Sequence, residues 1–418
     1  MSLRLSTIAL DIDAFKLIDR LPANPLAYIR GGEGLVGWGE ALRLEATGAN
    51  RIQELAAQWR HLANTAVVDD QVKLPGTGLV AFGSIGFADS SAAMSALIVP
   101  KILLGVRDGR TWLTTVEIDA EGHAVSTAEA EKFWGKDGAY APNHPVAFGA
   151  GAQTASGFKQ SVEQAVAAIA RGELEKVVLA RDLVGSLPAD FDIRTSLAKL
   201  ADRFPTCWVY SVDGLFGASP ELLVRVAHGQ VSARVLAGTA GRGTDPEVDK
   251  AIAAALAAST KNTTEHAFAV DSLVQTLTPF CEHVDADPKP FSLALPNLWH
   301  LASDVHGVLR EEASVLDLAA ALHPTAAVAG TPRLKAQQLL SELEPFDRGR
   351  YAGPVGWIGA DGDGEWAIAL RGAQIEGDLV EGATIRAFAG CGIVAGSEPE
   401  AELAETELKF SPIREALS

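Results

Sequence analysis

The chain has 418 residues, of which 48% are hydrophobic and 21% are charged, and its net charge is −18. This composition is typical of a globular protein with one large domain or about two to three smaller ones. The negative charge disfavours nucleic acid and anionic lipid as partners. An anionic substrate would therefore need local cations or a metal ion to hold it.

Neither a membrane segment nor an export signal is expected. The sequence has no uninterrupted apolar run of about 18 residues, the length that spans a bilayer. Asp11 and Asp13 interrupt the apolar stretch near the N-terminus, so we expect neither a signal peptide nor an anchor there. The chain has three cysteines, an odd number whose spacing matches no zinc motif, which predicts reduced thiols and a cytoplasmic location.

The N-terminal third carries secondary-structure signals but no chemical motif. Its apolar periodicity predicts a helix over Asn50–Thr65 and strands over Gly78–Phe82 and Ser95–Val99. Residues 136–157 are rich in Gly, Pro and Ala and lack periodicity, which indicates a loop or a boundary. We therefore predict an N-terminal part over residues 1–150 and a catalytic region over residues 151–418.

The periodicity is stronger beyond residue 157. It predicts, in chain order, a helix at 158–172, a strand at 174–185, one or two helices at 246–279, a strand at 298–309, a helix at 315–322 and hairpins at 353–393. Helices and strands alternate irregularly, and the hairpins come late. This pattern favours a layered α/β or α+β architecture over a simple doubly wound sheet.

The most informative stretch is residues 390–409, in which a glycine turn precedes an acidic helix. Glu402, Glu405 and Lys409 are spaced three and four apart and share one helical face. Two carboxylates beside a lysine suit Mg²⁺ next to an anion, because this ion binds one or two carboxylates and keeps waters for a substrate to displace. A solvated charged face is the alternative interpretation.

Two further groups are candidates for acid–base chemistry. Lys176 begins the predicted strand at 174–185, where it could be a partly buried general base or a lysine that extends to water. Glu221 follows a Ser-Pro turn and precedes an apolar run. It could be a general acid with a raised pKa or a solvated residue at the end of the turn.

The remaining candidates are weaker taken one at a time. Glu265 lies on a predicted helix and is either a surface carboxylate or a third Mg²⁺ ligand. His300 lies between apolar residues, which is typical of a hydrogen-bonded core histidine. Arg371 is a lone cation in a predicted apolar strand and needs a carboxylate from the protein or a ligand. Backbone N–H groups can approach an anion closely at two glycine sites, Gly238–Thr239 and Gly390–Gly392.

Nine segments in this order resemble the chorismate-utilising enzymes. This family includes isochorismate synthase, salicylate synthase, anthranilate synthase component I and aminodeoxychorismate synthase component I. The segments are LEKVVLAR, GASPELLV, LAGTAGRG, TEHAFAVD, LWHLAS, LHPTAAVAGTP, YAGPVGW, IALRGAQI and AGCGIVAGSEPEAELAETELK. They span about residues 158–410, whereas the N-terminal third resembles the family only loosely.

The resemblance implies a fold. We expect the α/β (α+β) class and a four-layer α/β/β/α chorismate-binding fold, like that of aminodeoxychorismate synthase, with two packed, mainly antiparallel sheets. Residues 1–150 would then contribute strands to the same unit, and residues 151–418 would form the chorismate-binding catalytic region. The family includes monomers, which is the state we expect here.

Two positions favour the branch of the family that adds water. The aminating members of the family carry glutamine where this chain has Lys176, and they tend to carry threonine where it has Ala327. This chain therefore differs from them at both positions. The wording of the segments most resembles isochorismate synthase. The chain departs from the family at Ala326, where many relatives have proline, and at Asn262, where anthranilate synthases carry a second glutamate.

By the same resemblance, the enzyme would add water at C2 of chorismate while the C4 hydroxyl leaves. Lys176 would be the base, Glu221 the acid, and His300 would orient the substrate. Mg²⁺ would be held by Glu265 and Glu405 with help from Glu402. Contacts to the substrate would come from Gly238, Thr239, Ala327, Tyr351, Arg371, Gly390, Gly392 and Lys409. Salicylate synthase is the nearest alternative, an aminating synthase is disfavoured, and a non-catalytic chorismate-binding protein is a third possibility.

Overall fold

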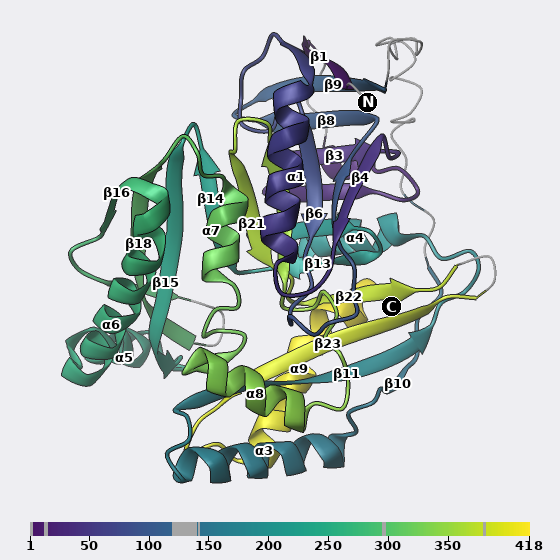
Figure 1. The fold of residues 1–418 in the computed structure, drawn as a ribbon. Coiled ribbons are helices and arrows are strands. Elements are labelled where there is room, and N and C mark those ends of the chain that lie inside the picture. The colour runs from purple at the N-terminus through teal and green to yellow at the C-terminus, as the bar shows by residue number, and fades with distance from the viewer. Residues whose placement is uncertain (1–2, 12–15, 119–139, 141–142, 295–297, 379–381) are drawn as a thin grey trace. The chain divides into compact units, whose positions relative to one another are not determined.

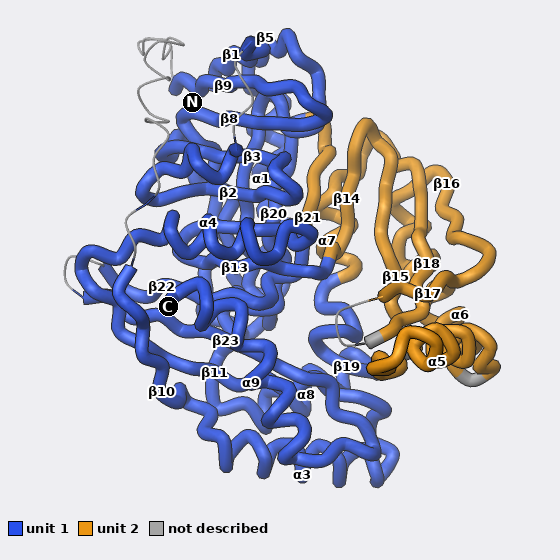
Figure 2. The backbone as a smooth tube through the Cα atoms, turned by 180° about the vertical axis from the view of Figure 1, so that it is seen from behind, with its two compact units in different colours: residues 1–221, 323–360, 367–418 blue, residues 222–322, 361–366 orange. Residues whose placement is uncertain are grey.

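A computed structural model describes the chain except residues 1–2, 12–15, 119–139, 141–142, 295–297 and 379–381, together with the side chains at positions 237, 239, 261, 265 and 298 (Figure 1). The chain forms two compact units (Figure 2). Unit 1 comprises residues 1–221, 323–360 and 367–418, and unit 2 comprises residues 222–322 and 361–366.

Unit 1 contains a thirteen-stranded sheet in which all the pairs with a recorded register are antiparallel except β1 with β5. Residues 3–118 supply six of the thirteen strands. The order across the sheet is β10 (Phe148–Ala150), β11 (Lys176–Ser186), β23 (Thr384–Ile393), β22 (Gly372–Glu376), β13 (Leu215–Ser219), β12 (Trp208–Val212), β2 (Leu26–Arg30), β3 (Glu33–Trp38), β8 (Ile102–Arg107), β9 (Arg110–Ile118), β1 (Leu3–Leu10) and β5 (Val67–Asp70), and β19 (Gly330–Thr331) also pairs with β11.

A second antiparallel sheet gives unit 1 its other layer. Its strands in this unit run in the order β20 (Pro354–Gly359), β6 (Val80–Ser84), β7 (Ser95–Val99) and β4 (Leu42–Ala46), and β6 and β20 pack against β12. The helix α1 (Arg51–Thr65) packs on β4 and β7, while the first sheet is covered by α3 (Ala155–Ala170), α4 (Ile193–Arg203) and α9 (Pro399–Ala416). The expected layering of helix, sheet, sheet and helix is therefore confirmed.

Two helices of unit 1, α1 and α3, form close to where the sequence periodicity places them. In α1 the residues Ile52, Leu55, Trp59 and Leu62 are buried, which is the three-and-four spacing of one helical face. The helix α3 begins at Thr154, whose side chain accepts a hydrogen bond from the N–H of Gly157. The predicted helices at Asn50–Thr65 and 158–172 and the predicted strand at Ser95–Val99 are thus confirmed.

Unit 2 is a smaller layer of strands and helices. Its strands run in the order β16 (Cys281–Ala286), β18 (Leu298–Leu309), β15 (Gln230–Gly241) and β14 (Leu222–Ala227), with β17 (Phe291–Ala294) also paired with β18. The helix α6 (Thr260–Leu277) and the helix α5 (Pro246–Ala258) pack on β15 and β18, and α7 (Val315–Leu322) packs on β14. One further strand, β21 (Gly364–Ile368), has residues in both units.

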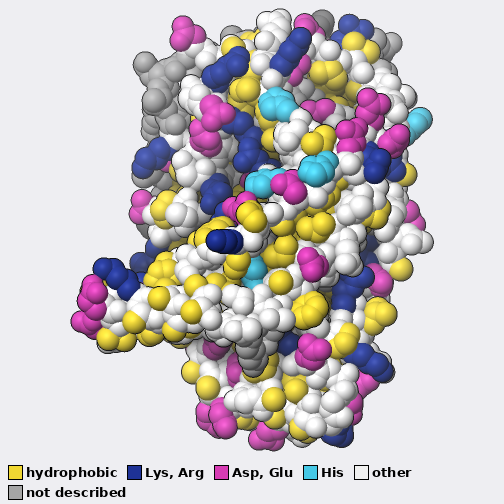
Figure 3. Space-filling view, turned by 90° about the vertical axis from the view of Figure 1, so that its left-hand side faces the viewer, with side chains coloured by type: hydrophobic (Ala, Val, Ile, Leu, Met, Phe, Trp, Pro, Cys, Tyr) yellow, Lys and Arg dark blue, Asp and Glu magenta, His cyan; other side chains and the backbone are white. Residues whose placement is uncertain are grey.

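The charge of the chain is spread rather than gathered on the face drawn in Figure 3, where acidic, basic and hydrophobic side chains are interspersed. Within the described residues, no helix is both long enough and apolar enough to cross a membrane. The division expected at residue 150 stays a prediction.

Candidate active site

Lys176 and Glu221 come from two strand ends of unit 1. Lys176 is the first residue of β11, and Glu221 follows β13 directly after the Ser219-Pro220 turn. Burial lowers the pKa of the Lys176 ammonium, and the positive charge of Lys409 lowers it further, although the carboxylates of Glu221 and Glu405 oppose both effects. Burial also raises the pKa of the Glu221 carboxyl, against the opposing charges of Lys176, Arg371 and Lys409. Each shift favours the neutral form.

The backbone around Glu221 is fixed on both sides. Its N–H donates to Ser219 Oγ at 3.2 Å, and its carbonyl accepts from the N–H of Ile368 at 3.0 Å. The Ser219 hydroxyl in turn donates to the carbonyl of Ile368 at 2.6 Å. The turn is therefore held against the end of β21, and this sets the direction from which the carboxyl enters the site.

The glycines of β23 make room for Lys176. β23 pairs with β11, with Gly392 opposite Val178 and Gly390 opposite Ala180. A Cβ atom at Gly392 would lie 2.7 Å from Cε of Lys176, and one at Gly390 would lie 2.7 Å from the carbonyl oxygen of Leu179. Side chains at these two positions would occupy the space used by the lysine and by the strand backbone, which explains why glycine is needed at both.

The helix α9 brings Lys409 and Glu405 beside β23, the strand that contains Gly390. Lys409 Nζ forms an ion pair with Glu405 at 2.6 Å and donates to the carbonyl of Gly390 at 2.7 Å. The side chain of Glu405 is 49% exposed, and that of Glu402 is half-buried one turn earlier. The predicted shared helical face is therefore present, and its lysine touches the glycine strand.

The donors on α9 fit a hard metal ion only in part. Glu402 and Glu405 supply two carboxylates, which is the number that Mg²⁺ commonly takes from a protein. No group of three His, Cys, Asp or Glu side chains suited to a metal was found within the described part of the chain. The side chain of Glu265 on α6, the third predicted ligand, lies outside that part, so the predicted set stays a prediction.

Tyr351 and Arg371 lie in two connecting segments of unit 1. Tyr351 is buried and stacks on Phe388 of β23 with ring centroids 4.9 Å apart, and burial raises its pKa to about 12. Arg371 is half-buried and its charge acts on both Glu221 and Tyr351. The prediction that Arg371 lies within a strand is wrong: it occupies the break between β21 and β22 with φ +51°, a conformation that ends strand pairing.

Ala327 and the unit 2 candidates complete the set. Ala327 is exposed in the turn that leads to β19. In unit 2, Gly238 adopts φ +81° at a bulge of β15, and Thr239 is paired with His300 of β18. The ring of His300 lies 3.4 Å from the carbonyl oxygen of Gly238 through Nδ1. The three residues Gly238, Thr239 and His300 thus form one local group, and the side chain of Thr239 lies outside the described residues.

The comparisons with known proteins identify the family of the chain. The model of the family described as "Chorismate binding enzyme" matches residues 9–418. This chain belongs to the chorismate-binding enzyme family.

Relatives and solved structures of this family resemble the chain over most of its length. The isochorismate synthase DhbC of Bacillus subtilis is 40% identical over 272 residues, which are 62% of this chain and 67% of the relative. The salicylate biosynthesis isochorismate synthase of Pseudomonas aeruginosa is 32% identical over 402 residues, covering 91% of this chain and 82% of the relative. The solved structure of MenF, the menaquinone-specific isochorismate synthase of Escherichia coli, has a TM-score of 0.77 and 26% identity, and the match covers 100% of this chain and 95% of that one.

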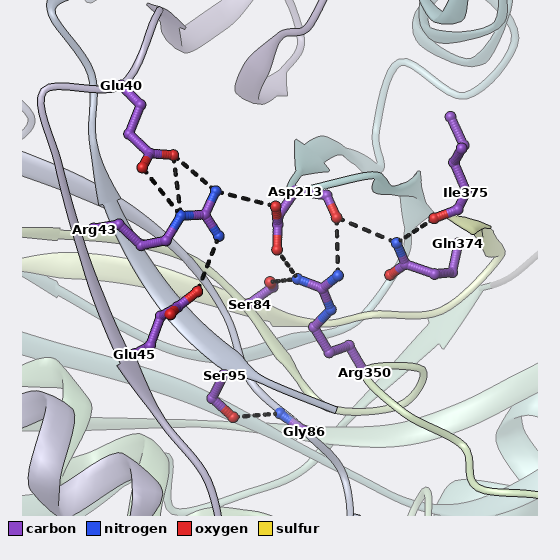
Figure 4. Close-up of polar contacts among 10 residues, drawn as sticks. All are labelled: Glu40, Arg43, Glu45, Ser84, Gly86, Ser95, Asp213, Arg350, Gln374 and Ile375. Carbon is purple, nitrogen blue, oxygen red and sulfur yellow. Dashed lines mark hydrogen bonds and ion pairs between the residues drawn. The ribbon is translucent and has the colours of Figure 1, made fainter. Parts of the chain in front are cut away.

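An ionic network shows how the N-terminal third supports the site of this chorismate-binding enzyme. Asp213, in the turn between β12 and β13, accepts from Arg350 at 2.7 Å and from Arg43 of β4 at 3.2 Å (Figure 4). Arg350 also donates to Ser84 of β6 at 3.0 Å. Because Arg350 immediately precedes Tyr351, side chains from residues 1–118 help to fix the segment that carries the tyrosine.

A neighbouring pocket of about 280 Å³ shares Tyr351 and Phe388 with the site. Two arginines that line it already bind carboxylates: Arg350 pairs with Asp213, and Arg386 pairs with Asp182 at 2.5 Å. Lys176 and Glu221 are not among its lining residues. The pocket is therefore separate from the two candidate acid–base residues.

Sequence reasoning missed two buried residues next to the site, Glu344 and Arg348. They form an ion pair of 2.6 Å, and their side chains are only 5% and 3% exposed. Their spacing of four residues carried no signal of a helical pair, because residues 344–348 follow the end of a helix and are not helical themselves.

Proposed function

We propose that this chain is a Mg²⁺-dependent isochorismate synthase, an isomerase that adds water at C2 of chorismate and releases the C4 hydroxyl. The observation that carries the proposal is the coupled pair of Lys176 and Glu221, whose pKa values are shifted in opposite directions. One group is favoured as a neutral amine and the other as a neutral carboxylic acid. A base and an acid in these states are what the addition and the departure require.

Lys176 takes a proton from the attacking water in this proposal. A lysine with an ordinary pKa is protonated near neutral pH and cannot accept a proton. Burial at the start of β11 lowers the pKa of Lys176, so that a larger fraction is present as the free amine. The paired strand β23, with Gly392 against the lysine stem, fixes the direction of the amine.

Glu221 donates a proton to the departing hydroxyl. Its raised pKa keeps the proton on the carboxyl at a pH where an exposed glutamate is ionised. The held turn after β13 keeps the carboxyl in place without a flexible loop. Tyr351, Arg371 and Lys409 supply the hydroxyl and cationic groups for the substrate carboxylates, and the backbone at Gly390 and Gly392 assists in binding them.

Mg²⁺ would be held by Glu402 and Glu405 of α9 together with Glu265. When bound, the ion would neutralise the ring carboxylate and stabilise negative charge on the departing side of the ring. We also propose that the protein is cytoplasmic and monomeric. The pathways differ among the relatives, since one is menaquinone-specific and another serves salicylate biosynthesis, and we propose menaquinone biosynthesis for this chain.

Product analysis tests the proposal. Purified protein is incubated with chorismate, with Mg²⁺ or with a chelator, and the products are resolved by chromatography. Metal-dependent isochorismate without salicylate is the expected result. Salicylate with pyruvate would identify the alternative, a salicylate synthase, at the same site. No turnover by folded protein in the presence of Mg²⁺, combined with thermal stabilisation by chorismate, would leave a binding protein instead.

A further inference from the structure

One edge of the strand that carries Lys176 is covered by strands only at its two ends. β19 pairs with Lys176 and Val177, and β10 pairs with β11 from Leu183 to Gly185. Between them, the polar groups that the backbone of β11 directs toward this edge include the carbonyl of Val178 and the N–H of Ala180, while the N–H of Val178 donates to the carbonyl of Ala329 at 2.9 Å. Such groups need partners when they are buried.

The ion pair of Glu344 and Arg348 supplies those partners. Arg348 Nη2 donates to the carbonyl of Val178 at 2.6 Å, and the N–H of Ala180 donates to Glu344 Oε1 at 2.8 Å. The guanidinium and the carboxylate bind each other through two hydrogen bonds, of 2.6 Å and 2.8 Å. One donor and one acceptor thus bond two backbone groups of β11 between its paired ends.

The same guanidinium reaches two further parts of the site. Its Nη1 donates to the carbonyl of Val328 at 2.8 Å, in the turn that contains Ala327. It also lies over the rings of Phe87 and Tyr351, 4.4 Å and 6.0 Å from their centroids. A single buried side chain therefore joins the base strand, the turn and the tyrosine segment.

We infer that Glu344 and Arg348 are positioning residues that hold Lys176, the turn at Ala327 and Tyr351 in one fixed arrangement for catalysis. A buried ion pair adds little net stability over a well-packed apolar pair of the same size. What an apolar pair cannot do is bond both backbone groups of β11 while bonding Val328. This inference rests on the proposed function for its catalytic readout only.

The chemistry of the pair explains why these two residue types are present. Arg348 uses Nε and both Nη nitrogens at once, in a planar fork that a lysine cannot reproduce. Glu344 accepts from the fork and from Ala180 with the same oxygen, Oε1. Replacement of the Arg348 guanidinium should therefore loosen β11 while the apolar side chains around it stay packed.

Three variants test the inference: Arg348→Lys, Glu344→Gln and the control Arg194→Lys. Arg194 also binds one carboxylate through Nε and Nη2, that of Asp192 at the start of α4, and none of its observed partners belongs to β11, to the turn at Ala327 or to Tyr351. Turnover of chorismate is measured per folded protein, which near-UV circular dichroism quantifies. Hydrogen exchange of the peptides at 176–183 and 325–331 is measured in parallel.

The expected result is a fall in kcat of roughly 10- to 100-fold for Arg348→Lys, with a smaller change in KM for chorismate. Glu344→Gln keeps an acceptor for the N–H of Ala180 and should give a smaller loss of kcat. This variant decides the test if Arg348→Lys does not fold. Exchange should accelerate in the two peptides and not elsewhere, and Arg194→Lys should match the wild type.

A wild-type kcat in folded Arg348→Lys and Glu344→Gln protein would overturn the inference. So would a loss of kcat no larger than that of the Arg194→Lys control. If the wild-type protein itself does not convert chorismate, the proposed function fails, and the exchange data alone then decide: unchanged protection at 176–183 overturns the positioning role, and a local loss of protection supports it.

Discussion

The two parts of the candidate site in unit 1 differ in how strongly their ionisable side chains are desolvated. The β11–β13 part leaves Lys176 and Glu221 half-buried, and their desolvation moves the pKa of each in the direction that favours its neutral form. The α9 part leaves Glu405 half-exposed and ion-paired with Lys409. The fold thus favours the neutral form of the two candidate acid–base groups, whereas the candidate groups for a metal ion and an anion form an ion pair beside solvent.

The difference follows from the elements that carry these residues. Strand backbones are fixed by pairing on both sides, so a lysine on β11 emerges in one direction and is desolvated by its neighbours. A residue on the outer face of a helix has a long side chain beside solvent, where a carboxylate keeps its charge at little cost. The comparison therefore predicts large effects on chemistry from the strands and effects on metal dependence from the helix.

The largest expected effect is that of Lys176→Gln. Removal of the base should lower kcat by roughly 10²- to 10⁴-fold, the usual contribution of general acid–base catalysis, while the variant remains folded. The measurement is isochorismate formation at saturating chorismate and Mg²⁺. Lys159→Gln is the matched control, because Lys159 is a surface lysine paired with Glu400. A variant at Lys176 that kept most of the wild-type rate would remove the lysine from the mechanism.

Glu221→Gln should have an effect of similar or slightly smaller size. The amide keeps the shape of the carboxyl but has no proton to give, so kcat should fall by roughly 10²- to 10⁴-fold, with chorismate still bound. Binding is checked by the shift in melting temperature with chorismate. Loss of chorismate binding with a normal residual kcat would make Glu221 a binding group instead of the acid.

A moderate effect is expected on the other side of the comparison, for Glu405→Gln. The Mg²⁺ concentration that gives half-maximal rate should rise by roughly 10- to 100-fold or more, since even partners outside the metal shell have effects of this size. Excess Mg²⁺ should restore much of the rate. Glu400→Gln on the first turn of α9 is the control, because Glu400 pairs with Lys159. An unchanged Mg²⁺ requirement would exclude Glu405 as a ligand.

The smallest effect is the pH dependence, and its sign follows from the two shifts. Activity needs Lys176 deprotonated, so the rate should rise with pH on the acid side, at lower pH than an ordinary lysine would allow. Activity also needs Glu221 protonated, so the rate should fall on the alkaline side, at higher pH than an ordinary glutamate would allow. Each limb should change about tenfold per pH unit. The rate therefore follows a bell-shaped pH profile, whose two apparent pKa values belong to Lys176 and Glu221 as a pair. A flat profile would contradict the comparison.

Local signals in the sequence predicted much of the fold. The burial pattern of α1 and the alternation around Lys176 depend on neighbours in sequence, so periodicity located them. The conformation of Arg371 was not predictable in this way, because its positive φ arises from a strand break that no local pattern marks. Glu344 and Arg348 were missed because their partners, Val178 and Val328, lie in distant segments that only the tertiary structure brings together.

The interleaving of early and late strands has a consequence for synthesis of the protein. β6, at residues 80–84, pairs with β20, at residues 354–359, and β11 pairs along its length with β23. Neither sheet of unit 1 can be completed until the ribosome has made nearly the entire chain. Non-local pairing of this kind slows folding and leaves apolar strands unpaired in the meantime. We expect truncated or stalled chains that end before residue 354 to aggregate, and folding in the cell to be largely post-translational.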